Sequence, residues 1–118
     1  MILARTETNA ETNAKAKSRK ELNLKMKFDL GKQFMTQGIA NMLDDTKVCE
    51  ELLGVLRQYT KCDWGDTPDE DKALNDRAVE TGEGRILAAY ETSKGKVWII
   101  TDFGDESNVT TMLLPEEY

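Results

Sequence analysis

The sequence predicts a small α+β domain, in which a small antiparallel sheet, built from a C-terminal three-stranded meander, packs with about three helices. Two patterns lead to this fold class. Apolar runs suited to strands follow one another over residues 85–111, and the short polar connections between them favour antiparallel pairing. Upstream, apolar residues recur at helical spacing, so helices precede these strands. Whether an N-terminal strand joins the sheet stays open.

The charge of the chain divides it into two parts. Residues 1–28 hold seven basic and three acidic residues, a balance of +4, whereas residues 29–118 hold nine basic and nineteen acidic residues, a balance of −10. We expect a flexible polar and basic tail over 1–24 and a single α+β domain over 25–118, because the tail has few large apolar residues to offset the entropy of ordering. In the alternative, the tail is a basic arm that binds nucleic acid or an acidic surface.

The domain begins with residues 26–30, whose apolar and polar side chains alternate with the periodicity of a strand. Phe34 and Met35 extend this strand, and Thr36 then caps a short helix. The apolar residues of that helix are Ile39, Met42 and Leu43.

A clearer helix is predicted over residues 46–59, with caps offered by Asp44, Asp45 and Thr46. One apolar stripe runs along it at helical spacing: Val48, Leu52, Val55, Leu56 and Tyr59. Leu53 widens this stripe, and the sheet is the surface on which we expect the stripe to pack.

The next helix follows a turn over 61–66 and opens with several agreeing signals. Thr67 stands at the N-cap, Pro68 at the first helical position, and Glu70 completes a capping box. The acidic residues at this helix start also suit the helix dipole. The helix is predicted to end by Gly82. Its inward-facing residues are Ala73, Leu74 and Ala78.

The strand predicted over 96–101 is apolar on both faces, because side chains alternate along a strand. Val97 and Ile99 point one way, and Trp98 and Ile100 point the other way. A strand of this kind is usually central and covered on both sides. We therefore expect a layer of structure over each face of the sheet.

The composition excludes several chemistries. The chain has no histidine, which removes histidine-activated nucleophiles, histidine acid–base catalysis and histidine-containing zinc sites. Cys49 and Cys62 fit no metal-ligand spacing, and we expect two free thiols in the cytoplasm, with a disulfide between them as the alternative. No apolar run approaches membrane-spanning length, so we expect no membrane association. No cofactor and no metal is predicted.

A cluster of carboxylates around a Trp-Gly turn is the candidate site. The candidate partner-binding residues are Asp63, Trp64, Asp66, Asp69, Glu70 and Asp71. The carboxylates either form a capped and solvated turn or bind a hard cation, although their spacing does not match an EF-hand loop. Trp64 either plugs the edge of the core or stands out as an interaction anchor. We predict no catalytic residue.

Several segments taken together carry a resemblance. The most distinctive are the Asp-Trp-Gly-Asp turn at 63–66, the Trp-Ile-Ile-Thr strand at 98–101 and the Leu-Pro-Glu-Glu-Tyr ending at 114–118. Over about residues 28–118 the chain resembles a family of small uncharacterised proteins carried on bacterial plasmids, conjugative elements and prophages. It departs from that family in having Gln58-Tyr59 in place of Arg-His, and Cys62 in place of a glycine. The resemblance implies an accessory, cytoplasmic protein associated with mobile DNA, and it brings no established activity with it.

The function that we expect is binding of a protein partner with a basic surface, without catalysis. One form of it is an acidic inhibitor of a host defence nuclease, of the anti-restriction or anti-CRISPR type, because carboxylates can replace phosphates in a basic channel. Direct binding of nucleic acid by the acidic body is not expected. The alternatives are a small metal-dependent hydrolase that uses the carboxylates of residues 63–71, and a nucleic-acid-binding regulator that uses the basic tail. The oligomeric state stays open.

Overall fold

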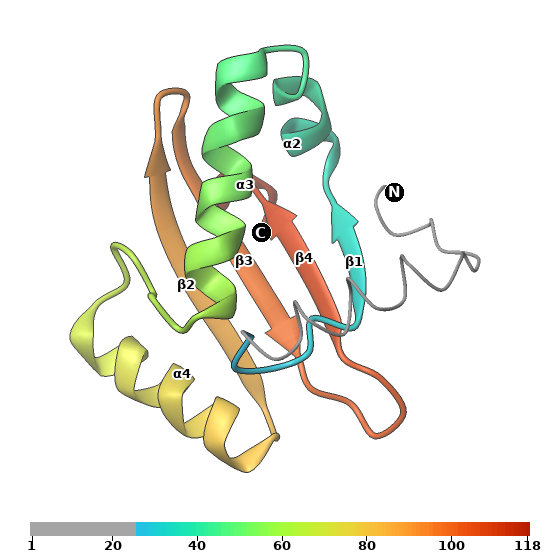
Figure 1. The fold of residues 1–118 in the computed structure, drawn as a ribbon, viewed down its shortest axis with the longest axis vertical. Helices are drawn as coiled ribbons and strands as arrows, with labels where there is room; N and C mark the ends of the chain where they lie inside the picture. The colour runs from blue at the N-terminus through green and yellow to red at the C-terminus, as the bar shows by residue number, and fades with distance from the viewer. Residues whose placement is uncertain (1–25) are drawn as a thin grey trace.

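The computed structural model describes residues 26–118, so the predicted tail lies outside the described residues (Figure 1). The elements are β1 (Lys32–Met35), α2 (Gln37–Met42), α3 (Thr46–Thr60), α4 (Asp69–Thr81), β2 (Arg85–Thr92), β3 (Gly95–Asp102), β4 (Val109–Leu113) and the 3-10 helix η3 (Pro115–Glu117). The α+β class and the C-terminal meander are confirmed. The helix predicted over 46–59 is α3, and the Asp45 side chain caps it by accepting hydrogen bonds from the N–H groups of Lys47 and Val48.

The four strands form one mixed sheet in the order β1-β4-β3-β2. The pairs β2–β3 and β3–β4 are antiparallel, whereas β1 runs parallel to β4. An N-terminal strand therefore joins the sheet, but the sheet is not wholly antiparallel. The cause lies in the long connection between β1 and β2, which contains α2, α3 and α4 and returns the chain to the same end of the sheet, so that β1 and β2 run parallel. The two antiparallel pairings β2–β3 and β3–β4 then make β4 parallel to β2, and therefore to β1.

Residues 26–30 do not form the strand that their alternation predicts, and β1 lies after them. The Phe28 ring packs edge-on against the Tyr59 ring, with 5.4 Å between centroids. The Lys27 N–H donates a hydrogen bond to the Thr60 carbonyl, 2.9 Å away. These contacts hold the segment across the end of α3, so its backbone is not available to a neighbouring strand.

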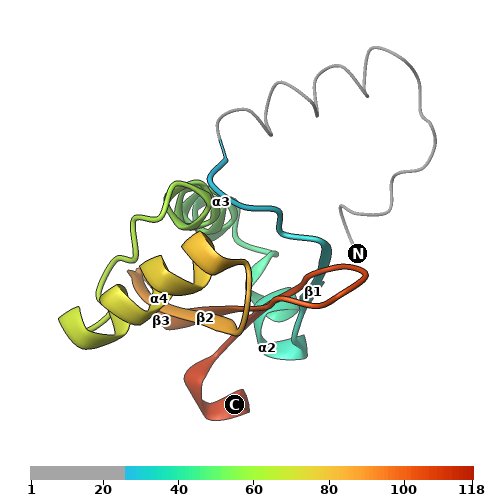
Figure 2. The same cartoon turned by 90° about the horizontal axis from the view of Figure 1, so that it is seen from below.

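The helices α3 and α4 lie on one face of the sheet, as Figure 2 shows. Most of the predicted α3 stripe is buried on this face: Val48, Leu52, Val55 and Tyr59. Leu56 is half-buried. Leu53 does not widen the buried stripe, because its side chain is 55% exposed and borders an open cavity between α3 and β1.

The second face of the sheet carries Trp98 and Ile100 and is covered differently from the prediction. In Figure 2, α3 and α4 lie on the opposite side of the sheet, and the C-terminal segment after β4 folds back across this face. The Tyr118 ring meets the Trp98 ring with 5.4 Å between centroids. Ile100 is buried, whereas Trp98 is half-buried. The cover on this face is therefore a short strap and not a full layer.

Candidate functional site

The predicted turn closes the outer edge of β2. The Asp66 N–H donates to the Ala89 carbonyl at 2.8 Å, and the Ala89 N–H donates to the Thr67 hydroxyl oxygen at 3.0 Å. The Thr67 hydroxyl in turn donates to the Trp64 carbonyl at 2.5 Å. The Thr67 side chain is thus occupied and does not cap the helix. Pro68 stands at the N-cap position without a side-chain hydrogen bond, and the predicted capping box is wrong.

The α4 residue Asn75 continues this closure, and no sequence pattern predicted this role for it. Its Nδ2 donates to the Leu87 carbonyl at 2.9 Å, and its Oδ1 accepts from the Leu87 N–H at 3.2 Å. Asn75 is buried, so the inward face of α4 meets the strand edge through a polar group. Leu74 is consequently turned outward and is 62% exposed, and Ala73 is exposed too, which contradicts the predicted burial of both residues. The predicted end of α4 at Gly82 is confirmed.

Trp64 belongs to the core. Its side chain is only 3% exposed, and its ring packs edge-on against Tyr59 with 5.6 Å between centroids. The indole Nε1 donates to Asp76 Oδ1 at 2.9 Å, which satisfies its one polar group. Of the two interpretations of this residue, the core plug is therefore correct, and Trp64 presents no surface for a partner.

Asp63 fixes the turn from within. Its carboxylate accepts hydrogen bonds from Gln58 Nε2 at 3.0 Å and from the Gly65 N–H at 3.2 Å. The Gln58 amide, followed by the Gly65 N–H, lowers the pKa of Asp63 below its usual value. The backbone is also held, since the Tyr90 hydroxyl donates to the Asp63 carbonyl at 2.7 Å. Gly65 has a φ of +62°, and an added Cβ would lie 2.5 Å from the Tyr90 ring, so the turn requires glycine.

The carboxylates of the turn and of the first turn of α4 lie together on the surface. We call the exposed group Asp63, Asp66, Asp69, Glu70 and Asp71 the acidic surface. The ion pairs among residues 26–118 are Arg85–Asp102 and Lys96–Glu91, and neither includes a member of the acidic surface. Its charge is therefore open to an external cation.

Across residues 26–118, no three Asp, Glu or Cys side chains come together as ligands for a metal ion. Cys49 and Cys62 are both free thiols, so the disulfide alternative is wrong. The exposed carboxylates of the acidic surface attract positive charge over a distance.

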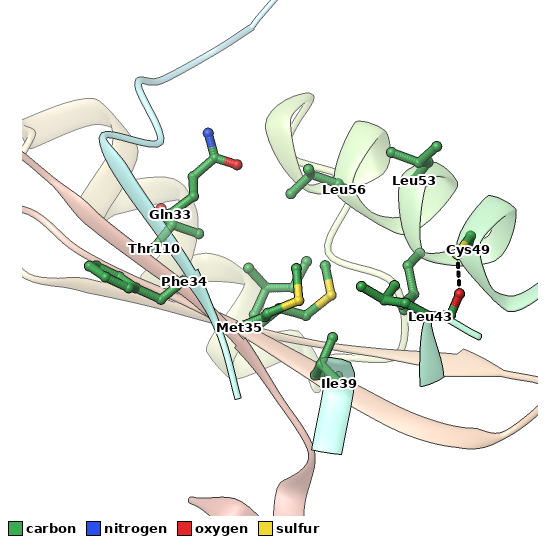
Figure 3. A pocket seen from close by; sticks show the side chains of 12 residues that line it. Gln33, Phe34, Met35, Ile39, Leu43, Cys49, Leu53, Leu56 and Thr110 are labelled. Atoms are coloured by element: carbon green, nitrogen blue, oxygen red, sulfur yellow. Dashed lines mark hydrogen bonds between the residues drawn. The ribbon is translucent and has the colours of Figure 1, made fainter. Parts of the chain in front are cut away.

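A second feature, an apolar cavity of about 290 Å³, lies between α3, α2 and the β1–β4 side of the sheet (Figure 3). It is lined by Gln33, Phe34, Met35, Ile39, Leu43, Cys49, Leu52, Leu53, Leu56, Ile99, Thr110 and Met112. Phe34 and Leu53 are each 55% exposed. No sequence pattern predicted this cavity, since Leu53 at its border was expected to widen the buried stripe of α3.

Comparison of the chain with protein-family models, with curated proteins and with solved structures finds no match. None of the helices between residues 26 and 118 has the length and apolar character needed to cross a membrane.

Proposed function

We propose that this chain is a non-enzymatic protein that binds a partner with a basic surface through the acidic surface. The observation that carries the proposal is a set of exposed carboxylates with no ion-pair partner among the described residues. The balance of −10 over residues 29–118 extends the same sign of charge over the body of the protein. Charge of one sign attracts a basic partner over a distance and raises the rate of association.

Rigidity of the supporting turn favours this use. Asp66 and Thr67 are bonded to Ala89, and Asn75 is bonded to Leu87, so two separate connections hold the turn and α4 against β2. A surface that is already ordered loses little conformational entropy on binding. The acidic surface can therefore present its carboxylates at nearly fixed positions.

The specific form that we propose is inhibition of a host defence nuclease by an accessory protein of a mobile genetic element. Its support is the resemblance of residues 28–118 to proteins of plasmids and prophages, together with the acidic charge. A basic nucleic-acid channel would accept carboxylates in the places of phosphates. The protein would work in the cytoplasm, where such nucleases meet DNA.

The test is a nuclease cleavage assay with the full-length chain and two matched double variants. Asp69→Lys with Glu70→Lys reverses two charges in the acidic surface. Asp105→Lys with Glu106→Lys makes the same change in net charge in the exposed loop before β4. We expect the first variant to lose inhibition by about tenfold or more, and the second to change it by about twofold or less, because close charge pairs contribute more than distant screened ones.

Salt provides the second readout of this assay, since attraction between exposed charges weakens as ionic strength rises. Inhibition by the unaltered chain should fall steeply with added salt. Equal inhibition by both double variants, or inhibition that salt leaves unchanged, contradicts the proposal.

The two alternative functions gain no comparable support. A metal-dependent hydrolase needs converging ligands, which the described residues do not supply. A nucleic-acid-binding regulator would depend on residues 1–24, which lie outside the described part of the chain.

A further inference from the structure

The two edge strands of the sheet differ in whether their outer backbone groups are hydrogen-bonded. The β2 edge is closed at Ala89 and Leu87 by the turn and by Asn75. On the opposite edge, β1 is the outermost strand, and no described helix or strand lies beyond it in Figure 1. Open strand edges with unpaired N–H and C=O groups are templates for another chain.

The register of β1 shows which backbone groups are open. The Lys32 N–H donates to the Asn108 carbonyl and the Thr36 N–H donates to the Met112 carbonyl, so the even-numbered residues face β4. Backbone groups alternate along a strand, and those of Gln33 and Met35 therefore point away from the sheet. No hydrogen bond among residues 26–118 outside the ladder with β4 engages them.

The apolar cavity adjoins this open edge. The side chains of Gln33 and Met35 line it, on the same face of the sheet as Met112 and Ile99. Figure 3 shows Leu53 and Leu56 of α3 on the far side of the space from β1. A strand added about 4.8 Å beyond β1 would direct every second side chain toward this face. Backbone pairing and an apolar pocket would then be available to one extended segment, as in strand-addition sites for peptides.

We propose that an extended segment of a basic protein partner pairs with β1 as a fifth strand and places an apolar side chain in the cavity. The lining fixes the apolar character of the anchoring residue. The charge of the segment follows from the balance of −10 over residues 29–118, which repels a second copy of this chain and attracts a cationic segment. The cationic character of the partner rests on the proposed function, whereas the open edge and the cavity do not.

The probe is a capped peptide of alternating leucine and lysine residues, added to the full-length chain labelled with ¹⁵N. Pairing predicts that amide hydrogen exchange slows at Gln33 and Met35, whose N–H groups point outward. It predicts no such change at Phe34, whose N–H faces β4. Slowed exchange at the first two residues supports the proposal, and unchanged exchange at both overturns it.

Two leucine variants test the cavity. Leu53→Glu alters the rim of the cavity at a residue that is 55% exposed, and Leu74→Glu makes the same change on α4 at a residue that is 62% exposed. Because both side chains are largely exposed, both variants should unfold at the same urea concentration as the parent. We expect Leu53→Glu to weaken peptide binding by about tenfold and Leu74→Glu by less than about twofold, since only the first opposes burial of an apolar side chain. Equal effects overturn the proposal.

Other occupants of the site would give their own signatures. A dimer of the full chain that Leu53→Glu dissociates in sedimentation would assign the edge to a second copy. Nuclear Overhauser contacts from residues 1–25 to Leu53 in the peptide-free chain would assign it to this chain's own N-terminal segment. Either result overturns the proposal.

Failure here and failure of the proposed function are separable. Asp69→Lys with Glu70→Lys lies on α4 and should leave exchange at Gln33 and Met35 responsive to the peptide. If inhibition depends on Asp69 and Glu70 while the peptide has no effect at β1, this inference alone is wrong. If the peptide binds at β1 while inhibition does not depend on Asp69 and Glu70, the proposed function of the acidic surface is wrong.

Discussion

The hydrogen bonds between Asn75 and Leu87 should contribute measurably to the free energy of unfolding. Asn75→Ala removes two hydrogen bonds, of 2.9 and 3.2 Å, between α4 and the edge of β2. Each such bond contributes about 0.5–1.5 kcal/mol net, and the better helix propensity of alanine returns about 0.6 kcal/mol. The free energy of unfolding should therefore fall by about 1–2 kcal/mol.

Asn75→Asp sharpens this prediction. The aspartate keeps an acceptor for the Leu87 N–H but places a second carboxylate oxygen against the Leu87 carbonyl, where the amide donated a hydrogen bond. We expect it to destabilise the fold at neutral pH more than alanine does. Part of that loss should be recovered at acidic pH, because the protonated carboxyl can donate again.

Urea unfolding followed by tryptophan fluorescence measures both variants. With a slope of about 1.5 kcal/mol per molar urea, the midpoint of Asn75→Ala should fall by about 1 M. Arg77→Ala, at an exposed position two residues along the same helix, is the control and should change the free energy of unfolding by less than about 0.5 kcal/mol. An Asn75→Ala midpoint equal to that of Arg77→Ala would refute the importance of this contact.

Two further predictions concern the turn and the C-terminal segment. Gly65→Ala should destabilise the fold by about 1–3 kcal/mol, because φ is +62° and the new Cβ would overlap Tyr90. Gly54→Ala in α3 should stabilise the fold by about 0.5–1 kcal/mol, because the new Cβ meets no atom within 4 Å. Thermal unfolding of both variants checks these opposite signs. The Thr36 hydroxyl, then the N–H groups of Leu114 and Gly38, lower the pKa of Glu117. The Glu117 carboxylate stabilises the fold above its unfolded pKa of about 4.3, and this stabilisation is lost as pH falls through the lower pKa of the folded state. Glu117→Gln should therefore make the free energy of unfolding depend less steeply on pH below about 4.3.

Local patterns in the sequence were sufficient where one element determines its own structure. The helical stripe and the Asp45 cap predict α3, and the left-handed Gly82 ends α4, because these features depend on neighbours within one turn. The antiparallel pairing of β2 with β3 likewise follows from the short polar connection between them.

Sequence patterns gave a wrong prediction where contacts with other parts of the fold determine the local structure. Residues 26–30 alternate as a strand does, but their partners are the end of α3 and the Tyr59 ring. Thr67 has the chemistry of a helix cap, yet its hydroxyl serves Trp64 and Ala89. Each case is a competition between a local and a tertiary hydrogen bond, which periodicity does not represent.

Burial on α4 fails for a related reason. Periodicity counts apolar residues, and by that count Leu74 should face the protein. The surface that α4 meets is the edge of β2, whose Leu87 N–H and C=O need partners once they leave water. Asn75 can satisfy both groups and leucine can satisfy neither, so the helix presents its amide inward.

The contacts of each carboxylate also divide the candidate site into residues with different roles. Asp63 directs its oxygens to Gln58 and Gly65, so its first role is to shape the turn, and its charge is partly engaged. Asp69, Glu70 and Asp71 receive no side-chain hydrogen bond from the described residues and lie in the first turn of α4, where the helix dipole favours their negative charge. A basic partner would therefore gain more from these three residues than from Asp63. The hydrogen bonds that close the β2 edge are the same ones that hold the turn and α4 in place, and this is why the acidic surface lies at the closed edge of the sheet and strand addition is left to β1.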